Sequence, residues 1–140
     1  MFEQKYRIQN TRRYKRLKSD YLVKYQEPGA TEVFVSNLKD ISAGGLKFWT
    51  DQIFAEKTLL RLSVWIPPLD RKLETLGRIL RVRKTKDAPI YYVSVQFIEI
   101  SVDDQKILNE FIEHLATVPE AHFLIHDAPV VKRKKAAQAA

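Results

Sequence analysis

Hydrophobic and polar residues alternate along most of the chain between residues 20 and 98, with the period of a β-strand that has one buried face. Pro28-Gly29, the small residues at 42–45 and Pro67-Pro68 interrupt the alternation as turns do, and Gly77 suggests a bulge. The pattern predicts strands at 21–26, 33–41, 46–49, 59–66, 73–83 and 91–97. Six strands joined by short turns are typical of a small antiparallel β-barrel.

The period changes to that of a helix after residue 100. Ser101 is a suitable N-cap, and Asp103 and Asp104 in the first turn favour the positive end of the helix dipole. An apolar stripe follows at Ile107, Leu108, Phe111, Ile112 and Leu115. We therefore predict an all-β fold with a terminal helix, in which a six-stranded antiparallel barrel is closed by a helix over residues 101–116. The stripe is expected to pack on the barrel, and a dimer contact is the alternative.

The distribution of charge separates the two ends of the chain from the part between them. The net charge is +7, and the excess of basic residues lies in the first 27 and the last 14 residues, while the part between them is nearly neutral. Residues 1–19 have neither period and are expected to form a flexible basic arm; residues 20–118 form the barrel and helix. Residues 119–140, with Lys132-Arg133-Lys134-Lys135, are expected to form a disordered basic tail. Basic ends indicate an anionic partner or simply aid solubility.

The composition argues against several functional classes. The chain has no cysteine, which excludes disulfides, thiolate catalysis and cysteine zinc sites and is compatible with a reducing cytoplasm. No stretch has the roughly 18 apolar residues of a membrane span, and the N-terminus does not resemble a secretory signal. HExxH, Walker-type and Ser-His-Asp patterns are missing, and the three histidines lie in or after the terminal helix. We predict a cytoplasmic protein that is not an enzyme and has no metal or cofactor.

The first cluster with recognisable chemistry lies in the arm, where residues 12–16 read Arg-Arg-Tyr-Lys-Arg. A guanidinium group presents a planar fork of donors that matches a phosphate or the O6/N7 edge of guanine. Arg12 and Arg16 are four residues apart, as the two arms of a clamp would be. A solvated basic run is the alternative interpretation.

The second cluster follows the predicted strand at 33–41 and reads Asp40-Ile-Ser42-Ala-Gly44-Gly45. A carboxylate at Asp40 accepts two hydrogen bonds, such as those from N1-H and N2-H of a guanine, and Ser42 suits a phosphate oxygen. The glycines allow backbone N–H groups to approach an anion closely. Aspartate, serine and glycine are also ordinary turn residues, so a simple turn is the alternative.

Taken together, Arg12-x-x-x-Arg16 and Asp40-x-Ser42-x-x-Gly45, followed by a barrel and a closing helix, resemble the PilZ domain, a bacterial receptor for cyclic di-GMP. The resemblance covers residues 11 to about 116. It includes the Gly-Leu-Lys-Phe run that begins at Gly45 and the late strand Val-x-Val-x-Phe at 93–97, with an isoleucine following. The sequence departs from the family at Ser94, where many members have glycine, and we expect this change to affect packing more than binding.

The resemblance implies roles for individual residues. Arg12 and Arg16 would grip guanine and phosphate, with Arg13 as an auxiliary. Asp40 would read the other guanine, and Ser42 would bind a phosphate.

Two further positions are also implied by the resemblance. Gly44 or Gly45 would give close backbone approach to the ligand. Arg81 falls near the place where some members carry an aromatic residue beside the ligand, and a guanidinium plane also stacks on a base.

The sequence thus predicts a single-domain receptor that binds cyclic di-GMP, closes its arm over the ligand and signals to a downstream protein, as a monomer or weak dimer. Residues 119–140 are expected to be dispensable for binding. One alternative is a small basic barrel for single-stranded nucleic acid, which requires basic and aromatic residues interleaved on one sheet face. The basic residues cluster at the ends of the sequence instead. Another is a PilZ-like adaptor that has lost its ligand.

Overall fold

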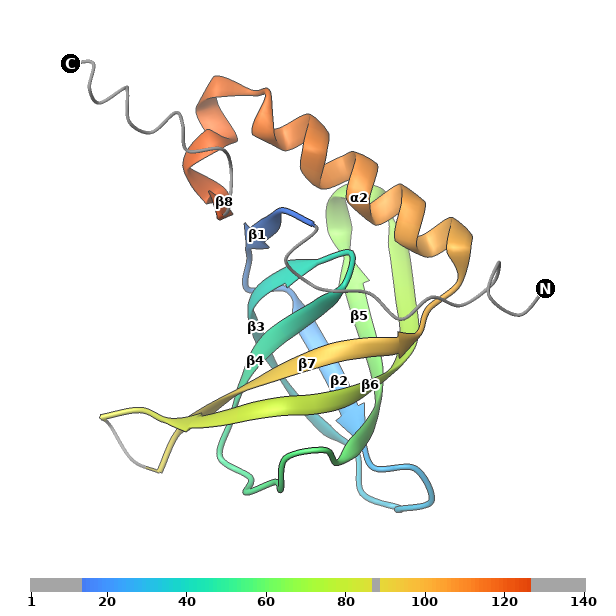
Figure 1. Ribbon diagram of the computed structural model, residues 1–140, viewed down its shortest axis with the longest axis vertical. Helices are drawn as coiled ribbons and strands as arrows, with labels where there is room; N and C mark the ends of the chain where they lie inside the picture. The colour runs from blue at the N-terminus through green and yellow to red at the C-terminus, as the bar shows by residue number, and fades with distance from the viewer. Residues whose placement is uncertain (1–13, 87–88, 127–140) are drawn as a thin grey trace.

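The computed structural model of the chain describes residues 14–86 and 89–126 (Figure 1). Its strands are β1 (Arg16–Lys18), β2 (Leu22–Gln26), β3 (Phe34–Ser42), β4 (Gly45–Thr50), β5 (Leu59–Ile66), β6 (Arg71–Lys84), β7 (Tyr91–Glu99) and β8 (Ile125–His126). Helix α2 spans Val102–Ala116, and two 3₁₀ helices are η2 (Pro67–Leu69) and η3 (Pro119–Leu124). All six strands predicted from the alternation are present.

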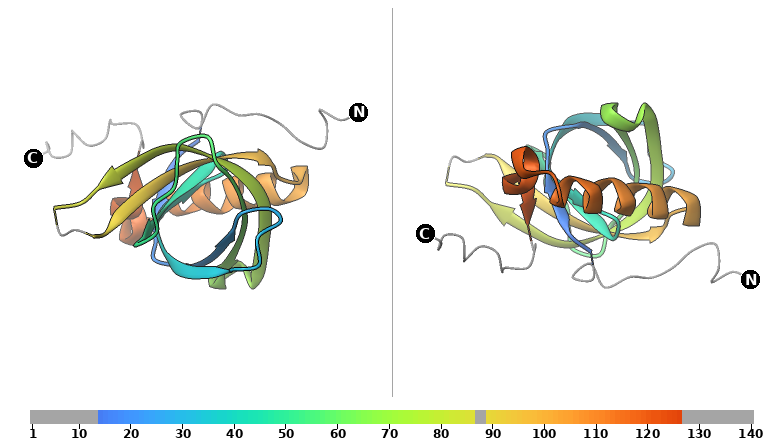
Figure 2. Two further views of the ribbon diagram at one scale, coloured as in Figure 1. Left: turned by 90° about the horizontal axis from the view of Figure 1, so that it is seen from below. Right: turned by 90° about the horizontal axis from the view of Figure 1, so that it is seen from above.

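The strands close into a barrel. Hydrogen-bonded neighbours follow the order β2-β5-β6-β7-β4-β3, and β2 also pairs with β3, so the six strands form a closed antiparallel ring. Figure 2 shows the ring from both ends. Closure leaves none of these six strands as a long free edge, which protects the sheet from pairing with other chains. The predicted fold class is confirmed.

Alternation of burial along the strands explains why they form. On β5, Leu60, Leu62, Val64 and Ile66 are buried inside the barrel, whereas the residues between them face outward. Inward-facing residues of the other strands continue this core, and Phe48 of β4 is one of its largest fully buried side chains. Burial of apolar side chains from every strand is the main source of stability of the barrel.

Helix α2 closes one end of the barrel, as the views along the barrel show (Figure 2). The Ser101 hydroxyl accepts a hydrogen bond from the Asp104 backbone N–H at 3.0 Å, which caps the helix as predicted. Leu108 and Ile112 are buried in the core, and the Gln105 side chain donates to the Ala43 carbonyl at 3.1 Å. The stripe therefore packs on its own barrel. No helix within the described residues is long and apolar enough to cross a membrane.

The predicted boundaries of the arm and the tail were wrong for two short segments. β1 pairs with the C-terminal end of β3, and β8 pairs with β1, with Leu17 opposite Ile125. Both of these side chains are buried in the core, so residues 16–18 and 119–126 belong to the folded body. Strands of two or three residues are too short to show alternation. Residues 14, 15 and 19 of the predicted arm are also described, and Lys15 forms an ion pair with Glu113 of α2 at 3.0 Å. Residues 1–13 and 127–140 lie outside the described residues.

Three bulges interrupt the barrel. The register of β6 against β7 shifts at Gly77, as predicted, and again between Ile79 and Arg81. The register of β3 against β4 shifts between Leu38 and Asp40. A bulge bends its strand and re-aims the neighbouring side chains. Two of the three bulges thus lie next to residues that the sequence analysis assigned to ligand binding.

Candidate functional site

A cavity of about 270 Å³ opens on the outer wall of the barrel, where β3, β4, β6 and β7 lie side by side near the end of β1. It brings together five of the eight predicted site residues: Arg16, Asp40, Ser42, Gly45 and Arg81. The same cavity is also lined by Leu46, Lys47, Leu80, Ser94 and Val95. Gly44 is not among the lining residues, and Arg12 and Arg13 lie outside the described residues.

Strand register explains how residues distant in sequence meet there. Asp40 on β3 is opposite Lys47 on β4, Lys47 is opposite Ser94 on β7, and Ser94 is opposite Arg81 on β6. These four residues form one row across four strands. β1 adds Arg16 because it pairs with β3 at Ile41 and Asp40. The row alternates acidic, basic, hydroxyl and basic side chains, which is a suitable set for a ligand with both hydrogen-bond donors and phosphates.

The β3–β4 turn is held by its own serine. The Ser42 hydroxyl accepts a hydrogen bond from the Gly44 backbone N–H at 3.1 Å and contacts the Gly45 carbonyl at 3.4 Å. This is the ordinary turn chemistry that the sequence analysis gave as the alternative, and it lies at the edge of the cavity. Ser42 therefore holds the turn and also lines the cavity.

Gly45 is required by the packing of β4 against β7. A Cβ atom at this position would lie 2.2 Å from the Val95 carbonyl oxygen, which belongs to the backbone of the neighbouring strand. A side chain there would push the two strands apart at the floor of the cavity.

We expect Gly45→Ala to destabilise the protein by about 1–3 kcal/mol, the usual cost of overpacking. Thermal unfolding of the purified variant measures this loss. Because the strands that separate also form the cavity wall, ligand affinity should fall with the stability. A variant with wild-type stability would show that β4 and β7 adjust freely and would contradict the packing role of Gly45.

Positive charge converges on Lys47. Burial lowers the pKa of the Lys47 ammonium below its usual value; Asp40 opposes this shift, and Arg16, Lys39 and Arg81 add to it. Three basic side chains are therefore close enough to Lys47 to repel its ammonium, and one carboxylate, that of Asp40, attracts it. A bound anion would relieve this repulsion, so the electrostatics of the cavity favour a negatively charged ligand.

Two polar residues of the cavity, Lys47 and Ser94, were not predicted as site residues from the sequence. Lys47 lies two positions after Gly45, so the alternation of β4 places both on the outer face, but only the register shows that Lys47 is opposite Asp40. Ser94 was expected to affect packing, yet it lines the cavity between Lys47 and Arg81. The alternation along each strand could have placed these side chains on the outer face of the barrel. The pairing of residues between strands, which brings them to one cavity, cannot be obtained from that alternation.

Aromatic and basic residues interleave on the row beside the cavity. The Trp49 and Tyr92 rings meet edge to face, with centroids 5.7 Å apart. The Lys39 ammonium lies 5.9 Å from the Trp49 ring and 5.2 Å from the Tyr92 ring, and Lys47 lies 5.9 Å from Tyr92. Arg83 is opposite Tyr92 on β6. The expectation that basic residues are confined to the ends is therefore wrong for this face.

Comparison with known proteins decides the family. Residues 10–114 match the sequence model of the family described as PilZ domain. The chain belongs to the PilZ domain family. No curated protein sequence matches the chain. PilZ domains are receptor and adaptor domains rather than enzymes, and they form a family of cyclic di-GMP receptors.

Solved structures with the same fold include other PilZ proteins. The Bacillus subtilis inhibitor of motility MotI/DgrA is 22% identical over 79% of this chain and 54% of its own, with a TM-score of 0.67. The PilZ domain of Escherichia coli YcgR with c-di-GMP is 17% identical over 75% of this chain and 91% of its own, with a TM-score of 0.59. The K. pneumonia MrkH–c-di-GMP complex gives 19% identity over 75% and 51%, with a TM-score of 0.60.

These likenesses show the barrel-and-helix fold of the PilZ domain. The chain spans about half the length of MotI and MrkH. Two of the three neighbours were solved with c-di-GMP, which is a fact about those proteins. Within the described residues, no group of three or more histidine, aspartate or glutamate side chains is placed to hold a metal ion.

Proposed function

We propose that this PilZ chain is a single-domain receptor and adaptor that binds cyclic di-GMP, without a cofactor, and signals to a downstream protein. The observation that supports this most strongly is the row Asp40, Lys47, Ser94 and Arg81, joined by Arg16 from β1. Its single carboxylate within a positive cavity fits a ligand that carries both guanine donors and phosphates.

Each residue has a chemical task in this proposal. The Asp40 carboxylate accepts the N1-H and N2-H donors of one guanine, and the Arg16 guanidinium grips a phosphate or the O6/N7 edge of the other guanine. Lys47 supplies positive charge to a phosphate, and Ser42 donates its hydroxyl. Arg81, at the end of the row, offers its plane for stacking on a base.

The size of the cavity supports a role for the arm. Ligand pockets usually enclose about 300–1,000 Å³, and this cavity, at about 270 Å³, is small for a ligand with two nucleotides. We propose that Arg12 and Arg13 complete the site from the segment before Arg16, with Gly44 at the turn. Movement of this segment onto the ligand changes the surface presented to the downstream protein.

A second candidate function follows from the neighbouring row. Basic and aromatic side chains interleaved on one sheet face, as at Lys39, Trp49 and Tyr92, are the arrangement that proteins use to bind single-stranded nucleic acid. In this alternative the phosphates lie in the same positive cavity and the bases stack on the rings.

Asp40→Asn distinguishes the two functions. An asparagine accepts only one of the two guanine donors and turns its own donor toward the other, so cyclic di-GMP affinity should fall by about 1–3 kcal/mol. The same change removes negative charge from an anion site, so binding of a single-stranded oligonucleotide through its phosphates should stay equal or improve. Calorimetric titration of both ligands measures the two effects.

Asp40 is buried, so thermal unfolding of the variant must accompany the titration. An Asp40→Asn protein that is folded and binds cyclic di-GMP like the wild type would remove Asp40 from guanine recognition. The β3–β4 turn would then have a structural role only and no role in guanine recognition.

A further inference from the structure

The barrel carries a second distinctive surface on the wall formed by β2, β5 and the start of β3. We call it the β2–β5 face, and it comprises Leu22, Lys24, Val33, Val35, Ser63 and Trp65. Four of the eight large apolar side chains exposed within the described residues lie on it. Leu22 is 56% exposed, Val33 51%, Val35 57% and Trp65 43%. Apolar side chains that gather on one face of a barrel indicate a surface that another protein covers.

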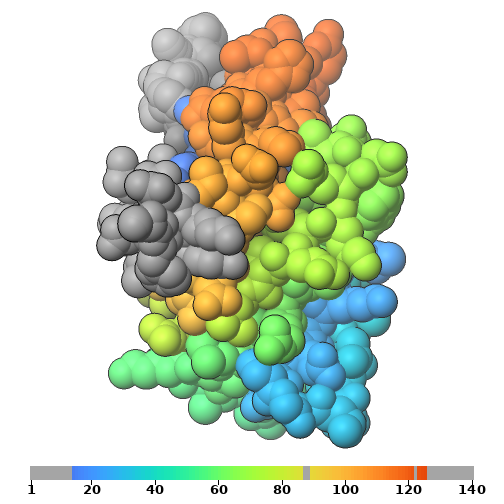
Figure 3. Space-filling view, turned by 90° about the vertical axis from the view of Figure 1, so that its right-hand side faces the viewer, coloured from blue at the N-terminus to red at the C-terminus, as the bar shows by residue number. Residues whose placement is uncertain are grey.

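Strand pairing shows that these residues are neighbours. Lys24 on β2 is opposite Val35 on β3 and opposite Ser63 on β5. Leu22 and Trp65 lie next to the pair formed by Val23 and Val64, which puts them on adjacent strands at the same level. Figure 3 shows this side of the molecule, with the green surface of β5 and β6 between helix α2 in orange and the blue segment of β2 and the start of β3.

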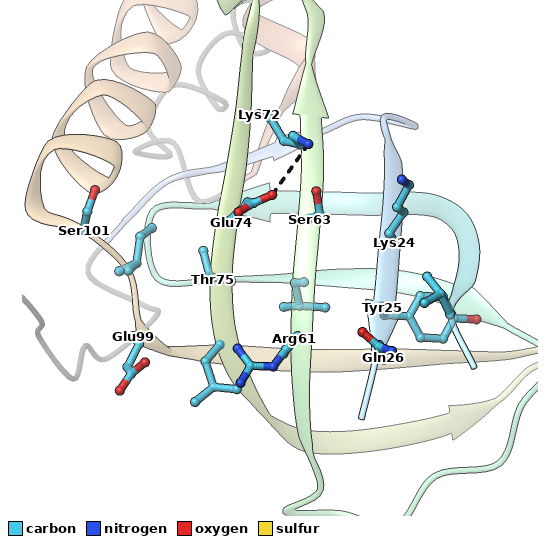
Figure 4. A pocket seen from close by; sticks show the side chains of 14 residues that line it. Lys24, Tyr25, Gln26, Arg61, Ser63, Lys72, Glu74, Thr75, Glu99 and Ser101 are labelled. Atoms are coloured by element: carbon cyan, nitrogen blue, oxygen red, sulfur yellow. Dashed lines mark ion pairs between the residues drawn. The ribbon is translucent and has the colours of Figure 1, made fainter. Parts of the chain in front are cut away.

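A groove of about 510 Å³ lies on the same face. The short side chain of Ser63 lies between Lys24 on one side and Glu74 on the other (Figure 4), and Lys72 pairs with Glu74 at 3.6 Å. Because Ser63 is smaller than its neighbours, it leaves room at the centre of the groove. Trp65 is two residues further along β5, so it projects from the same outer side of that strand.

A projecting tryptophan and a groove that lie on one face suit an interface related by a two-fold axis. In such an interface the same surface of both subunits is used, so Trp65 of each copy enters the groove of the other. The groove also carries both signs of charge: besides the Lys72–Glu74 pair, it is lined by the basic residues Lys24 and Arg61 and the acidic residue Glu99. Because both signs are present, a second copy meets no net repulsion of like charges at the groove, which favours a second copy over a partner of one charge.

We propose that the β2–β5 face is the docking site for a second copy of this chain. The face is separate from the candidate ligand cavity, because β2 and β5 lie across the ring from β4 and β7. Two copies joined there keep both cavities open. The proposal does not depend on cyclic di-GMP binding, and it assigns the apolar surface that the receptor function leaves unexplained.

Sedimentation velocity of the full chain over a wide concentration range tests the proposal. We expect a concentration-dependent dimer. Trp65→Lys and Ser63→Trp, which remove the projection and fill the groove, should each raise the dimer dissociation constant by about tenfold or more, as expected for the loss of a hot-spot tryptophan. Ile53→Lys is the matched control, because Ile53 is 79% exposed and lies outside this face; its dimer should equal that of the wild type.

Two further measurements keep the test specific. Thermal unfolding should show that the variants are folded. Titration of Trp65→Lys with cyclic di-GMP should give the affinity of the wild type, so a failure of ligand binding is distinguished from a failure of dimerisation. The proposal is overturned if the wild type is monomeric throughout, if folded Trp65→Lys dimerises as the wild type does, or if Ile53→Lys disrupts the dimer as strongly as Trp65→Lys.

Discussion

Truncation after Val118 should destabilise the protein and weaken its ligand binding. The deletion removes η3 and β8, and with them the burial of Ile125 and the packing of Leu124 on the core. Each apolar side chain is worth about 1.5–3 kcal/mol when fully buried, so the loss of folding free energy should be about 3 kcal/mol. β1 would lose its outer partner, and Arg16 lies in β1. Cyclic di-GMP affinity should therefore fall by about tenfold or more, a change of about 1.4 kcal/mol.

Truncation after His126 is the matched control. It removes the basic cluster at 132–135 but leaves β8 paired with β1. Thermal unfolding and calorimetry should give values close to those of the full chain, because the removed charges act through a field screened over roughly 10 Å. Equal behaviour of the two truncated proteins would contradict a structural role for η3 and β8. It would restore the sequence-based expectation that all of 119–140 is dispensable.

Replacement of Arg16 by alanine should weaken cyclic di-GMP binding by about 1.5–3 kcal/mol, or roughly 10- to 150-fold. The expected loss is large because a hydrogen bond from a guanidinium to a phosphate or a guanine is charge-assisted. The barrel should stay folded, because the residue of β1 that enters the core is Leu17 and not Arg16. Calorimetric titration measures the affinity, and thermal unfolding checks the fold.

Lys18→Ala provides a charge-matched control on the same strand. Lys18 is exposed and does not line the cavity, yet its substitution removes the same charge from β1. We expect a change of less than about twofold for this variant, since exposed charges act weakly at physiological salt. A similar loss in both variants would mean that general positive charge, and not the placement of Arg16, determines affinity.

Most of the barrel and the helix followed from the sequence because each long element has its own period. Buried and more exposed residues alternate over the eight residues of β5 and the nine of β7. Helix α2 follows a serine N-cap and carries an apolar stripe. β1 and β8 could not be predicted from the sequence, because each is a short segment with a single buried residue, Leu17 or Ile125. Only the pairing of the two strands shows that these residues belong to the core.

The part of the candidate site that lies within the two sequence motifs could be predicted from the sequence. Arg16, Asp40, Ser42 and Gly45 were found by residue type and spacing, and the structure places all four at one cavity. Lys47 was not found, because residue spacing does not give the register between β3 and β4. The aromatic row was missed for a related reason. Its members come from separate strands, and only the pairing of β4 with β3 and β7 makes them neighbours.

Calorimetric titration of the purified full chain with cyclic di-GMP tests the central claim most directly, with GTP and a single-stranded oligonucleotide as competing ligands. The account predicts saturable binding of cyclic di-GMP, weaker binding of GTP, and loss of affinity in Arg16→Ala and Asp40→Asn. Ligand should also raise the unfolding temperature, since it binds only the folded chain. A folded wild-type protein that shows neither binding heat nor thermal stabilisation with cyclic di-GMP, or that binds the oligonucleotide more tightly, would contradict the account.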